Sequence, residues 1–253
     1  MSDPPDEHEG LEKKPFLEHL SDLRAVLIKI LVVFVVCAVV CFAALGPIFE
    51  LLRVPLRALP EAEEVALITL GPQEGFLALM TIAFSAAFVL STPFTLYFVA
   101  QFVLPGLKRR EKRMLAPAFV AGAFLFLAGL VFGFFVTLPL VLRLLWGLYE
   151  RLGWHNMWTV RFYVSFVTKF MLANGLIFEL PLVLVLLVRL ELVTIAQLRK
   201  RRRHAIMIIL IVGACLTPPD APSMFMVAVP MVLLYEASII VSTIFERRRR
   251  RIG

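Results

Sequence analysis

The chain has 253 residues and a formal net charge of +7, and 60% of its residues are hydrophobic, which gives a mean hydropathy of +0.87. Its uncharged stretches are longer than the core helices of soluble domains, so the composition excludes a soluble enzyme and predicts an all-α, polytopic membrane protein. The excess of bases does not indicate nucleic-acid binding, because the bases cluster at alternate ends of the apolar stretches.

The first residues, 1–14, are rich in Pro, Asp and Glu and are expected to form a disordered acidic tail. A short amphipathic helix should follow, because apolar side chains recur at helical spacing at Phe16, Leu20, Leu23 and Leu27. It leads into a first span at about 24–46. No cleavable signal peptide is expected, since this apolar segment is a full span without an obvious small-residue cleavage site.

Two long apolar stretches predict the second and third spans, at about 73–104 and 114–142. Residues 75–107 carry no charge. As a helix they would measure about 50 Å, against about 30 Å for the hydrocarbon core of a bilayer, so the second helix must tilt, kink or protrude. The loops at 46–71 and 143–160 contain Pro and Trp residues that suit an interfacial cap: Pro47, Pro55, Pro60, Trp146, Trp154 and Trp158.

The last third of the chain is less regular, and we expect three further spans there, at about 160–188, 204–217 and 222–245. The first is interrupted by Lys169 and Glu179, and the other two are short. A tight hairpin at L-T-P-P-D would join the short spans, which requires a thinned bilayer or protection by neighbouring helices. The prediction is therefore one membrane domain of six spans over 15–246, followed by a basic tail at 247–253.

The distribution of bases predicts the orientation of these spans. Of the 26 Lys and Arg residues, 20 lie around the start of the first span, between the second and third, between the fourth and fifth, or after the sixth. Five lie in the intervening loops, at Arg53, Arg57, Arg143, Arg151 and Arg161. Because basic loops stay in the cytoplasm, both termini are expected to be cytoplasmic. Lys169 belongs to neither group.

Prolines recur within or at the ends of the predicted spans, at Pro93, Pro105, Pro117, Pro139, Pro181 and Pro230. Each removes a backbone donor and bends its helix, so together they favour a shaped cavity, although proline is also commoner in membrane helices generally. Signatures of nucleophilic, phosphate-binding or metal-dependent enzymes are missing, and Cys37, Cys41 and Cys215 read as small apolar residues. We therefore expect no cofactor, no metal and no catalysis.

Two acids are expected at the cytoplasmic rim. Asp22 lies at the edge of the first span, one helical turn after Glu18, and two carboxylates there could receive a guanidinium group. Glu111 is the only acid among the bases between the second and third spans. Arginine suits such a site because its planar fork makes bidentate bonds to carboxylates. The alternatives are a solvated acidic face for Asp22 and a local salt bridge for Glu111.

Glu179 stands within an apolar span, where a charged side chain costs at least about 2.5–3.5 kcal/mol, so it is a candidate functional residue. Its helical face, with Gly175 and Thr168, predicts contact with another helix. Lys169 lies about 15 Å away along the axis and about 80° off that face, so it is not the same-helix partner. The alternative is a neutral core Glu bonded near the carbonyl that Pro181 frees.

Two further acids lie near the C-terminus. Asp220 follows Pro219 and is best explained as an N-cap of the sixth span. Glu236 is the second acid within an apolar span, and it either lines the same cavity as Glu179 or sits near the inner interface.

Four strings together resemble the TatC family, the multi-spanning receptor subunit of the twin-arginine protein translocase. They are H-L-S-D-L-R before the first span, F-V-L-P-G-L-K-R-R-E-K-R after the second, F-E-L-P in the fourth, and L-T-P-P-D followed by P-M-V-L-L-Y-E. They occur in the right order and spacing over about 15–245. The resemblance implies a glove-shaped bundle of six transmembrane helices with a concave face, in the bacterial inner membrane.

The resemblance also implies a site for signal peptides that carry paired arginines. The family's two cytoplasmic acids fall on Asp22 and Glu111, and the predicted signal-peptide site comprises Asp22, Glu111, Glu18, Arg24 and Phe102. The chain has Asp22 where the family usually has Glu, so its reach toward the arginine pair is shorter by one methylene.

A second implied surface contacts partner helices. The family's intramembrane acid, which faces a polar residue of a TatA or TatB helix, falls on Glu179, and the predicted contact surface comprises Glu179, Glu236, Pro230 and Met224. Met224 stands where glutamine is common, which weakens a polar contact there. The structural turn is predicted at Pro218, Pro219 and Asp220, and the periplasmic cap is predicted to include Pro55.

The leading hypothesis is therefore a translocase receptor without an ATP site, driven by the proton gradient as the resemblance implies. Its expected partners are TatA- or TatB-like single-span proteins, the signal peptides of folded cargo, further copies of itself and membrane lipid. The rival hypothesis is a proton- or ion-coupled secondary transporter in which Glu179, Lys169 and Glu236 form a relay, although the chain lacks an internal repeat. A membrane-embedded hydrolase ranks third, because no nucleophile with a base can be named.

Overall fold

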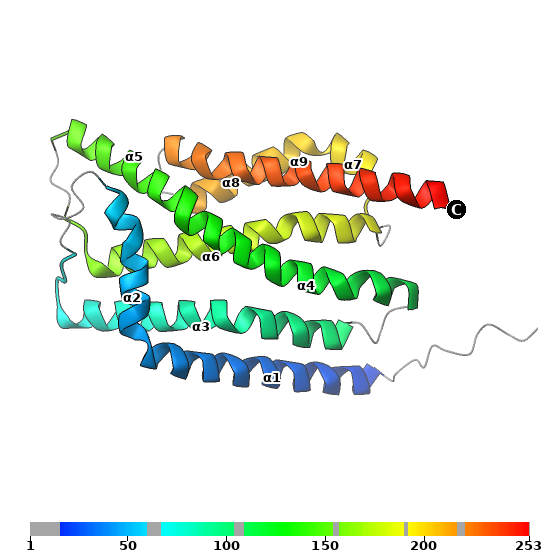
Figure 1. The fold of residues 1–253 in the computed structure, drawn as a ribbon, viewed down its shortest axis with the longest axis horizontal. Coiled ribbons are helices and arrows are strands. Elements are labelled where there is room, and N and C mark those ends of the chain that lie inside the picture. Colours follow the sequence, from blue (N-terminus) through cyan, green and yellow to red (C-terminus); the bar gives the residue numbers. More distant parts are fainter. Residues whose placement is uncertain are drawn as a thin grey trace, which may run out of the picture.

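The computed structural model describes residues 16–59, 67–103, 109–153, 157–189, 192–216 and 221–252. The named elements within these ranges are all helical, which confirms the predicted all-α class (Figure 1). The elements are α1 (Phe16–Ala43), α2 (Leu45–Arg53), the 3-10 turn η1 (Val54–Ala58), α3 (Pro72–Val103), α4 (Arg109–Phe132), the π-helical turn η3 (Gly133–Thr137), α5 (Leu138–Arg151), α6 (Val160–Arg189), α7 (Ile195–Lys200), α8 (Arg202–Leu216) and α9 (Ala221–Ile252).

The long helices lie side by side, with α6 in the middle of the bundle (Figure 1). Helix α1 packs on α3, helices α3, α4 and α9 pack on α6, and α8 packs on α9. The start of α1, the end of α3, the start of α4 and the ends of α6 and α9 lie at one end of the molecule, which we call the basic end. The opposite end, which we call the cap end, holds α2, the starts of α3 and α6 and the end of α5.

Five helical segments are long and apolar enough to cross a membrane: Ser21–Ala43, Pro72–Phe102, Pro117–Arg151, Val160–Val188 and Val227–Ile244. Helix α8 has 15 residues and falls short of that length. It measures about 22 Å, compared with about 30 Å for the hydrocarbon core. The described residues therefore establish a multi-spanning helical protein, and α8 is the element on which a sixth span depends.

The third long helix continues beyond the uncharged stretch from which the sequence predicts it. Helices α4 and α5 are joined through η3 without a break and reach Arg151, where the sequence indicated a loop from 143. Pro139 lies at the start of α5 and cannot donate a backbone hydrogen bond to the preceding turn, so the chain widens there instead of ending. Arg143 is tolerated because it points to the exposed side of α5, opposite the buried Val141 and Leu145.

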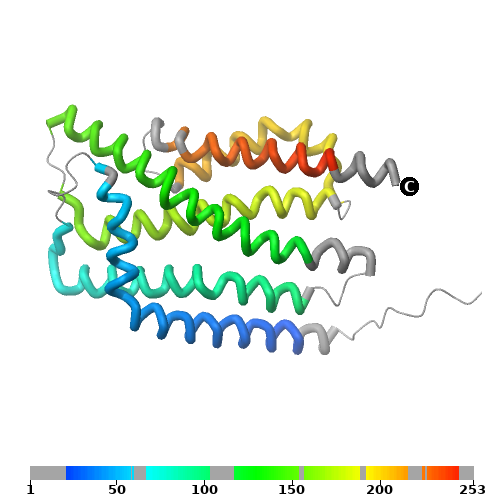
Figure 2. The backbone as a smooth tube through the Cα atoms, in the orientation of Figure 1, coloured from blue at the N-terminus to red at the C-terminus, as the bar shows by residue number. Residues whose placement is uncertain are grey.

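The loop expected at 46–71 also contains helical structure. Helix α2 turns away from the end of α1 and runs across α3 at the cap end (Figure 2). It is followed by η1, where Pro55 is buried. The hydroxyl of Tyr163 in α6 donates a 2.6 Å hydrogen bond to the carbonyl of Leu52. A short parallel bridge joins Ile68 to Thr159, with the amide of Val160 donating to the Ile68 carbonyl at 2.9 Å. The two predicted outer loops are therefore linked to each other.

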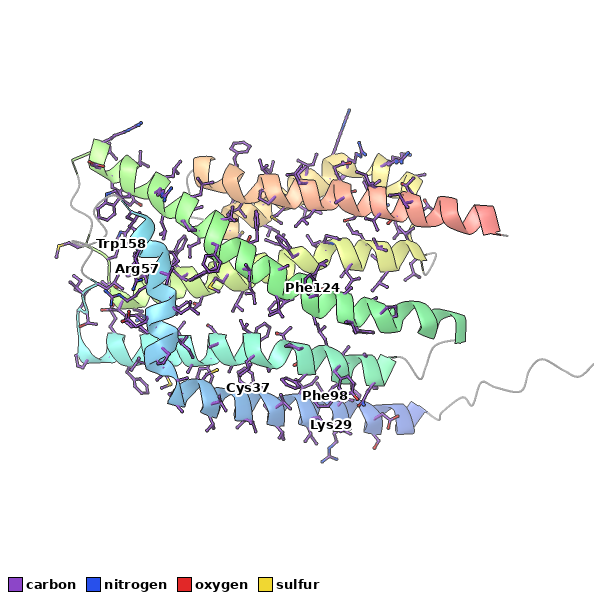
Figure 3. All side chains as sticks on the ribbon, viewed as in Figure 1. Lys29, Cys37, Arg57, Phe98, Phe124 and Trp158 are labelled. Atoms are coloured by element: carbon purple, nitrogen blue, oxygen red, sulfur yellow. The ribbon has the colours of Figure 1, made fainter. Side chains whose placement is uncertain are left out.

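Aromatic rings complete the cap. Trp158 stacks on Tyr163 with ring centroids 6.4 Å apart and meets Trp146 edge to face at 5.7 Å. Such pairs add packing energy beyond simple burial. Figure 3 shows Trp158 beside the region of Arg57, at the end of the bundle where α2 and η1 lie.

The core follows α5, α6 and α9, with fully buried side chains that include Leu138, Val141, Val164, Phe170 and Ile239. A smaller cluster forms where Cys37, Ala38 and Cys41 of α1 pack on Ala87 of α3 (Figure 3). Many large apolar side chains remain exposed, among them Leu31 and Val39 on α1. An apolar surface of this extent fits a lipid environment.

Candidate functional site

Glu179 lies on α6 and packs against α4. A Cβ atom placed on Gly122 of α4 would lie 3.1 Å from Oε2 and 3.4 Å from Oε1 of Glu179, and 2.9 Å from Cδ2 of Leu182. The carboxyl group therefore occupies space that any side chain at position 122 would need. The sequence predicted that this face of α6 contacts another helix, and α4 is the helix that the structure places there.

Glycines on α4 and at the start of η3 make this close approach to α6 possible. A Cβ atom on Gly129 would come within 2.7 Å of the Asn174 carbonyl and of Cβ of Phe178, and one on Gly133 within 2.8 Å of Cβ of Asn174. From the other side, a Cβ atom on Gly175 would meet the Phe126 ring at 2.7 Å. Because these distances are shorter than real Cβ contacts, the α4–α6 interface depends on glycine.

The sequence analysis missed Gly122, Gly129 and Gly133. A signal was present, since G-L-V-F-G at 129–133 is a small-xxx-small pattern within an apolar segment, which typically marks a helix-packing face.

The Glu179 carboxyl is not satisfied within the described part of the chain. Glu179 is partly buried, and its Oε1 atom is buried without a hydrogen-bond partner. The nearby amide of Asn174 donates instead to the carbonyl of Phe170, at 2.9 Å on its own helix. A buried acceptor without a donor is costly, which marks Glu179 as a candidate functional residue.

Glu236 has an intramolecular partner. Its Oε2 atom accepts a 2.8 Å charged hydrogen bond from Nη2 of Arg202, the first residue of α8. Beside it, the Tyr235 hydroxyl donates to the Leu198 carbonyl at 2.9 Å, and Arg199 reaches Thr243 at 3.4 Å. These bonds tie α7 and the start of α8 to α9. They place Glu236 near the basic end of the bundle.

The other predicted contact and turn residues fall around α8 and α9. Met224 packs on Gly213 of α8, since a Cβ atom there would lie 3.4 Å from the Met224 carbonyl. Pro230 lies inside α9. The predicted turn residues Pro218, Pro219 and Asp220 lie outside the described residues.

The basic end brings together the helices that carry the predicted signal-peptide residues. Asp22, partly buried, and the exposed Arg24 lie in the first half of α1, and Phe102, also partly buried, lies in the last turn of α3. Glu18 is in the first turn of α1 and Glu111 in the first turn of α4, but their side chains lie outside the described part. The start of α1, the end of α3 and the start of α4 lie together at the basic end (Figure 1). We call this edge of the bundle the rim.

No group of three or more His, Cys, Asp or Glu side chains is placed to hold a metal ion in the described ranges. The three cysteines are free thiols, with Cys37 and Cys41 buried and Cys215 exposed. The described side chains thus offer carboxylates for ionic and hydrogen-bonded contacts.

A family model described as Sec-independent protein translocase protein (TatC) matches residues 18–230. Among curated proteins, the chain is 35% identical to a Sec-independent protein translocase protein TatC of Desulforapulum autotrophicum, over 94% of this chain and 87% of that one. It is also 35% identical to the TatC protein of Aquifex aeolicus, over 94% of this chain and 98% of that one.

Solved structures of a twin arginine translocase receptor, TatC, have the same fold. One matches with a TM-score of 0.78 and 35% identity, covering 89% of this chain and 98% of that one. A second, described as TatC in DDM, matches with a TM-score of 0.79 and 35% identity over 88% of this chain and 99% of that one.

Proposed function

Because the chain belongs to the TatC family of Sec-independent protein translocase proteins, we propose that it is the signal-peptide receptor at the core of a twin-arginine translocation complex. TatC proteins are multi-spanning translocase components and not enzymes. In this proposal the chain binds Arg-Arg signal peptides of folded proteins and works with TatA- or TatB-type single-span partners. Transport is driven by the proton-motive force.

The proposed orientation places the basic end in the cytoplasm of a bacterium and the cap end in the periplasm. The described bases Arg24, Lys29 and Arg199–Arg203 lie toward the basic end, where the positive-inside tendency would retain them. Helix α8 is then the sixth span. It is short, and its charged first turn is held at the cytoplasmic surface by the Arg202–Glu236 ion pair. The surrounding bases hold anionic lipid, and several copies assemble in the complex.

The observation that carries the receptor proposal is the shared rim of α1, α3 and α4. Asp22 is partly buried there, so a guanidinium group bound to it is shielded in part from water and salt. Glu111 begins α4 at the same rim, and two carboxylates can accept the paired forks of neighbouring arginines. Glu18, Arg24 and Phe102 flank these acids, and the phenyl ring supplies an apolar contact for the signal peptide.

Selective retention of a signal peptide tests this proposal. The purified chain, immobilised in detergent, is incubated with a labelled Arg-Arg signal peptide and with the same peptide carrying Lys-Lys. We expect about tenfold or greater preference for Arg-Arg, because lysine cannot form the bidentate bond. Equal retention of the two peptides would remove the specificity on which the proposal rests.

For the partner surface, the proposal assigns Glu179 to contact with a single-span helix, with Glu236, Pro230 and Met224 on the adjoining surface of α9. The unsatisfied Oε1 atom of Glu179 supports this assignment, since a polar side chain from a partner would supply the missing donor. The rival transporter has less support, because Glu236 is already paired with Arg202 and does not offer a free relay group.

A further inference from the structure

Lys169 is a base at membrane depth that the proposed function does not use. It is the ninth residue after Val160, which begins α6, so it lies about 14 Å along the helix from the cap end. It belongs to the segment Val160–Val188, one of the five that are long and apolar enough to span a membrane, and its side chain is exposed. An ammonium group at this depth is rare and needs a partner.

The surroundings of Lys169 on α6 are apolar. It belongs to an outward-facing stripe with Phe162, Leu176, Leu180 and Val183, which follow helical spacing and are all exposed, Phe162 at 75% and Leu176 at 57%. The opposite side of the helix carries buried residues such as Val164 and Val167. The stripe is therefore a surface for packing against another helix, with one positive charge in the half that is nearer the cap end.

No partner for this charge lies within the described residues. None of them forms a hydrogen bond or an ion pair with the Lys169 ammonium. Glu179 lies about 15 Å further along the axis and about 80° around it, and its carboxyl packs on Gly122 of α4. The four-carbon stem of lysine is also shorter than the distance from Lys169 to the cap end of α6.

We propose that Lys169 pairs with a carboxylate carried within the membrane by a single-span partner helix that packs on the stripe from Phe162 to Val183. Charge complementarity selects this occupant. A wholly apolar partner helix would leave the Lys169 ammonium unpaired, whereas a carboxylate within a partner helix also needs an opposite charge at membrane depth. The stripe supplies the area against which the partner helix packs. The ion pair with Lys169 fixes the depth of that helix in the membrane and its register along α6. This inference rests on the proposed association with single-span subunits.

The test measures how much of the single-span subunits is retained when the tagged full chain is purified from membranes of cells that also produce those subunits. Lys169→Met and Lys169→Glu should each lower retention at least about fivefold, and Lys169→Arg should keep it within about twofold. Arg151→Met removes an exposed base at the cap end and serves as the matched control. Replacing the intramembrane acid of the subunit with Lys should restore retention by the Lys169→Glu chain.

The outcomes separate this inference from the proposed function. If the Lys169→Met chain retains the single-span subunits, the inference about Lys169 is overturned. If Glu179→Leu lowers retention in the same assay, the proposed partner surface at Glu179 still stands. Loss with Lys169→Met but no rescue of Lys169→Glu by any intramembrane acid-to-Lys change overturns the carboxylate partner. If the unmodified chain retains no single-span subunit, both are wrong.

Discussion

At the scale of single residues, the two intramembrane acids have opposite environments. Glu236 is satisfied by Arg202 and belongs to the local structure of α8 and α9. Glu179 instead packs on the backbone of Gly122 and leaves a buried oxygen without a donor. A group that destabilises the chain and is held in place by close packing is typical of a functional site.

Glu179→Leu should separate stability from partner binding. The leucine side chain has a similar volume and removes the buried unsatisfied oxygen, so we expect the purified chain to unfold in detergent at a temperature equal to or higher than that of the unmodified chain. A photo-crosslinking residue at Leu180, the exposed neighbour of Glu179, should label a single-span subunit several-fold less in this variant.

A crosslinking residue at Val36, on the exposed side of α1, is the control for general collisions in the membrane. A lower unfolding temperature together with unchanged crosslinking would mean that Glu179 has a structural role within the chain and not a role in partner contact.

At the scale of elements, the long helices could be predicted from sequence because apolar stretches of span length permit few alternatives in a membrane. The end of α5 could not be predicted in this way. Arg143 interrupts the uncharged run, but a helix continues through a charge when that side chain lies on its exposed side. The Arg202–Glu236 pair was also beyond sequence reasoning, since it joins residues 34 positions apart through the packing of α8 on α9.

The α4–α6 interface gives a prediction at this scale. Gly129→Ala should destabilise the chain by about 1–3 kcal/mol, because its Cβ would overlap the Asn174 carbonyl and Phe178. Gly147→Ala is the matched control, since nothing lies within 4 Å of a Cβ there and alanine favours a helix by about 1 kcal/mol. Thermal unfolding of both variants in detergent measures the difference, and equal unfolding temperatures would contradict glycine-dependent packing.

At the scale of the whole molecule, the proposed sites of signal-peptide recognition and partner contact lie in different places. Asp22 and the first turn of α4, which contains Glu111, lie at the rim, whereas Glu179 lies within the span of α6. The cap end is held together by Tyr163, Trp158 and the Ile68–Thr159 bridge. A firmly joined cap suits a scaffold whose exchangeable contacts are at the rim and on the sides of the bundle.

The family and the helical fold followed from the sequence because the four strings and the apolar stretches are strong local signals. The side-chain environment of Glu179 could not be predicted from the sequence, because it depends on how closely α4 approaches α6. Glycines about 50 residues earlier in the chain, such as Gly129, set that distance. The sequence predicted Asp22 at the edge of the first span. The structure adds that α3 ends and α4 begins at the same rim.

Export of a folded reporter with an Arg-Arg signal peptide, in cells that lack their own TatC and produce this chain with its single-span subunits, tests the central claim most directly. Asp22→Asn combined with Glu111→Gln should reduce export to the level seen without the chain, because both proposed acceptors of the arginine pair are neutralised. The control Glu50→Gln with Glu150→Gln removes two exposed acids at the cap end and should leave export unchanged. Undiminished export after loss of Asp22 and Glu111 would contradict the account.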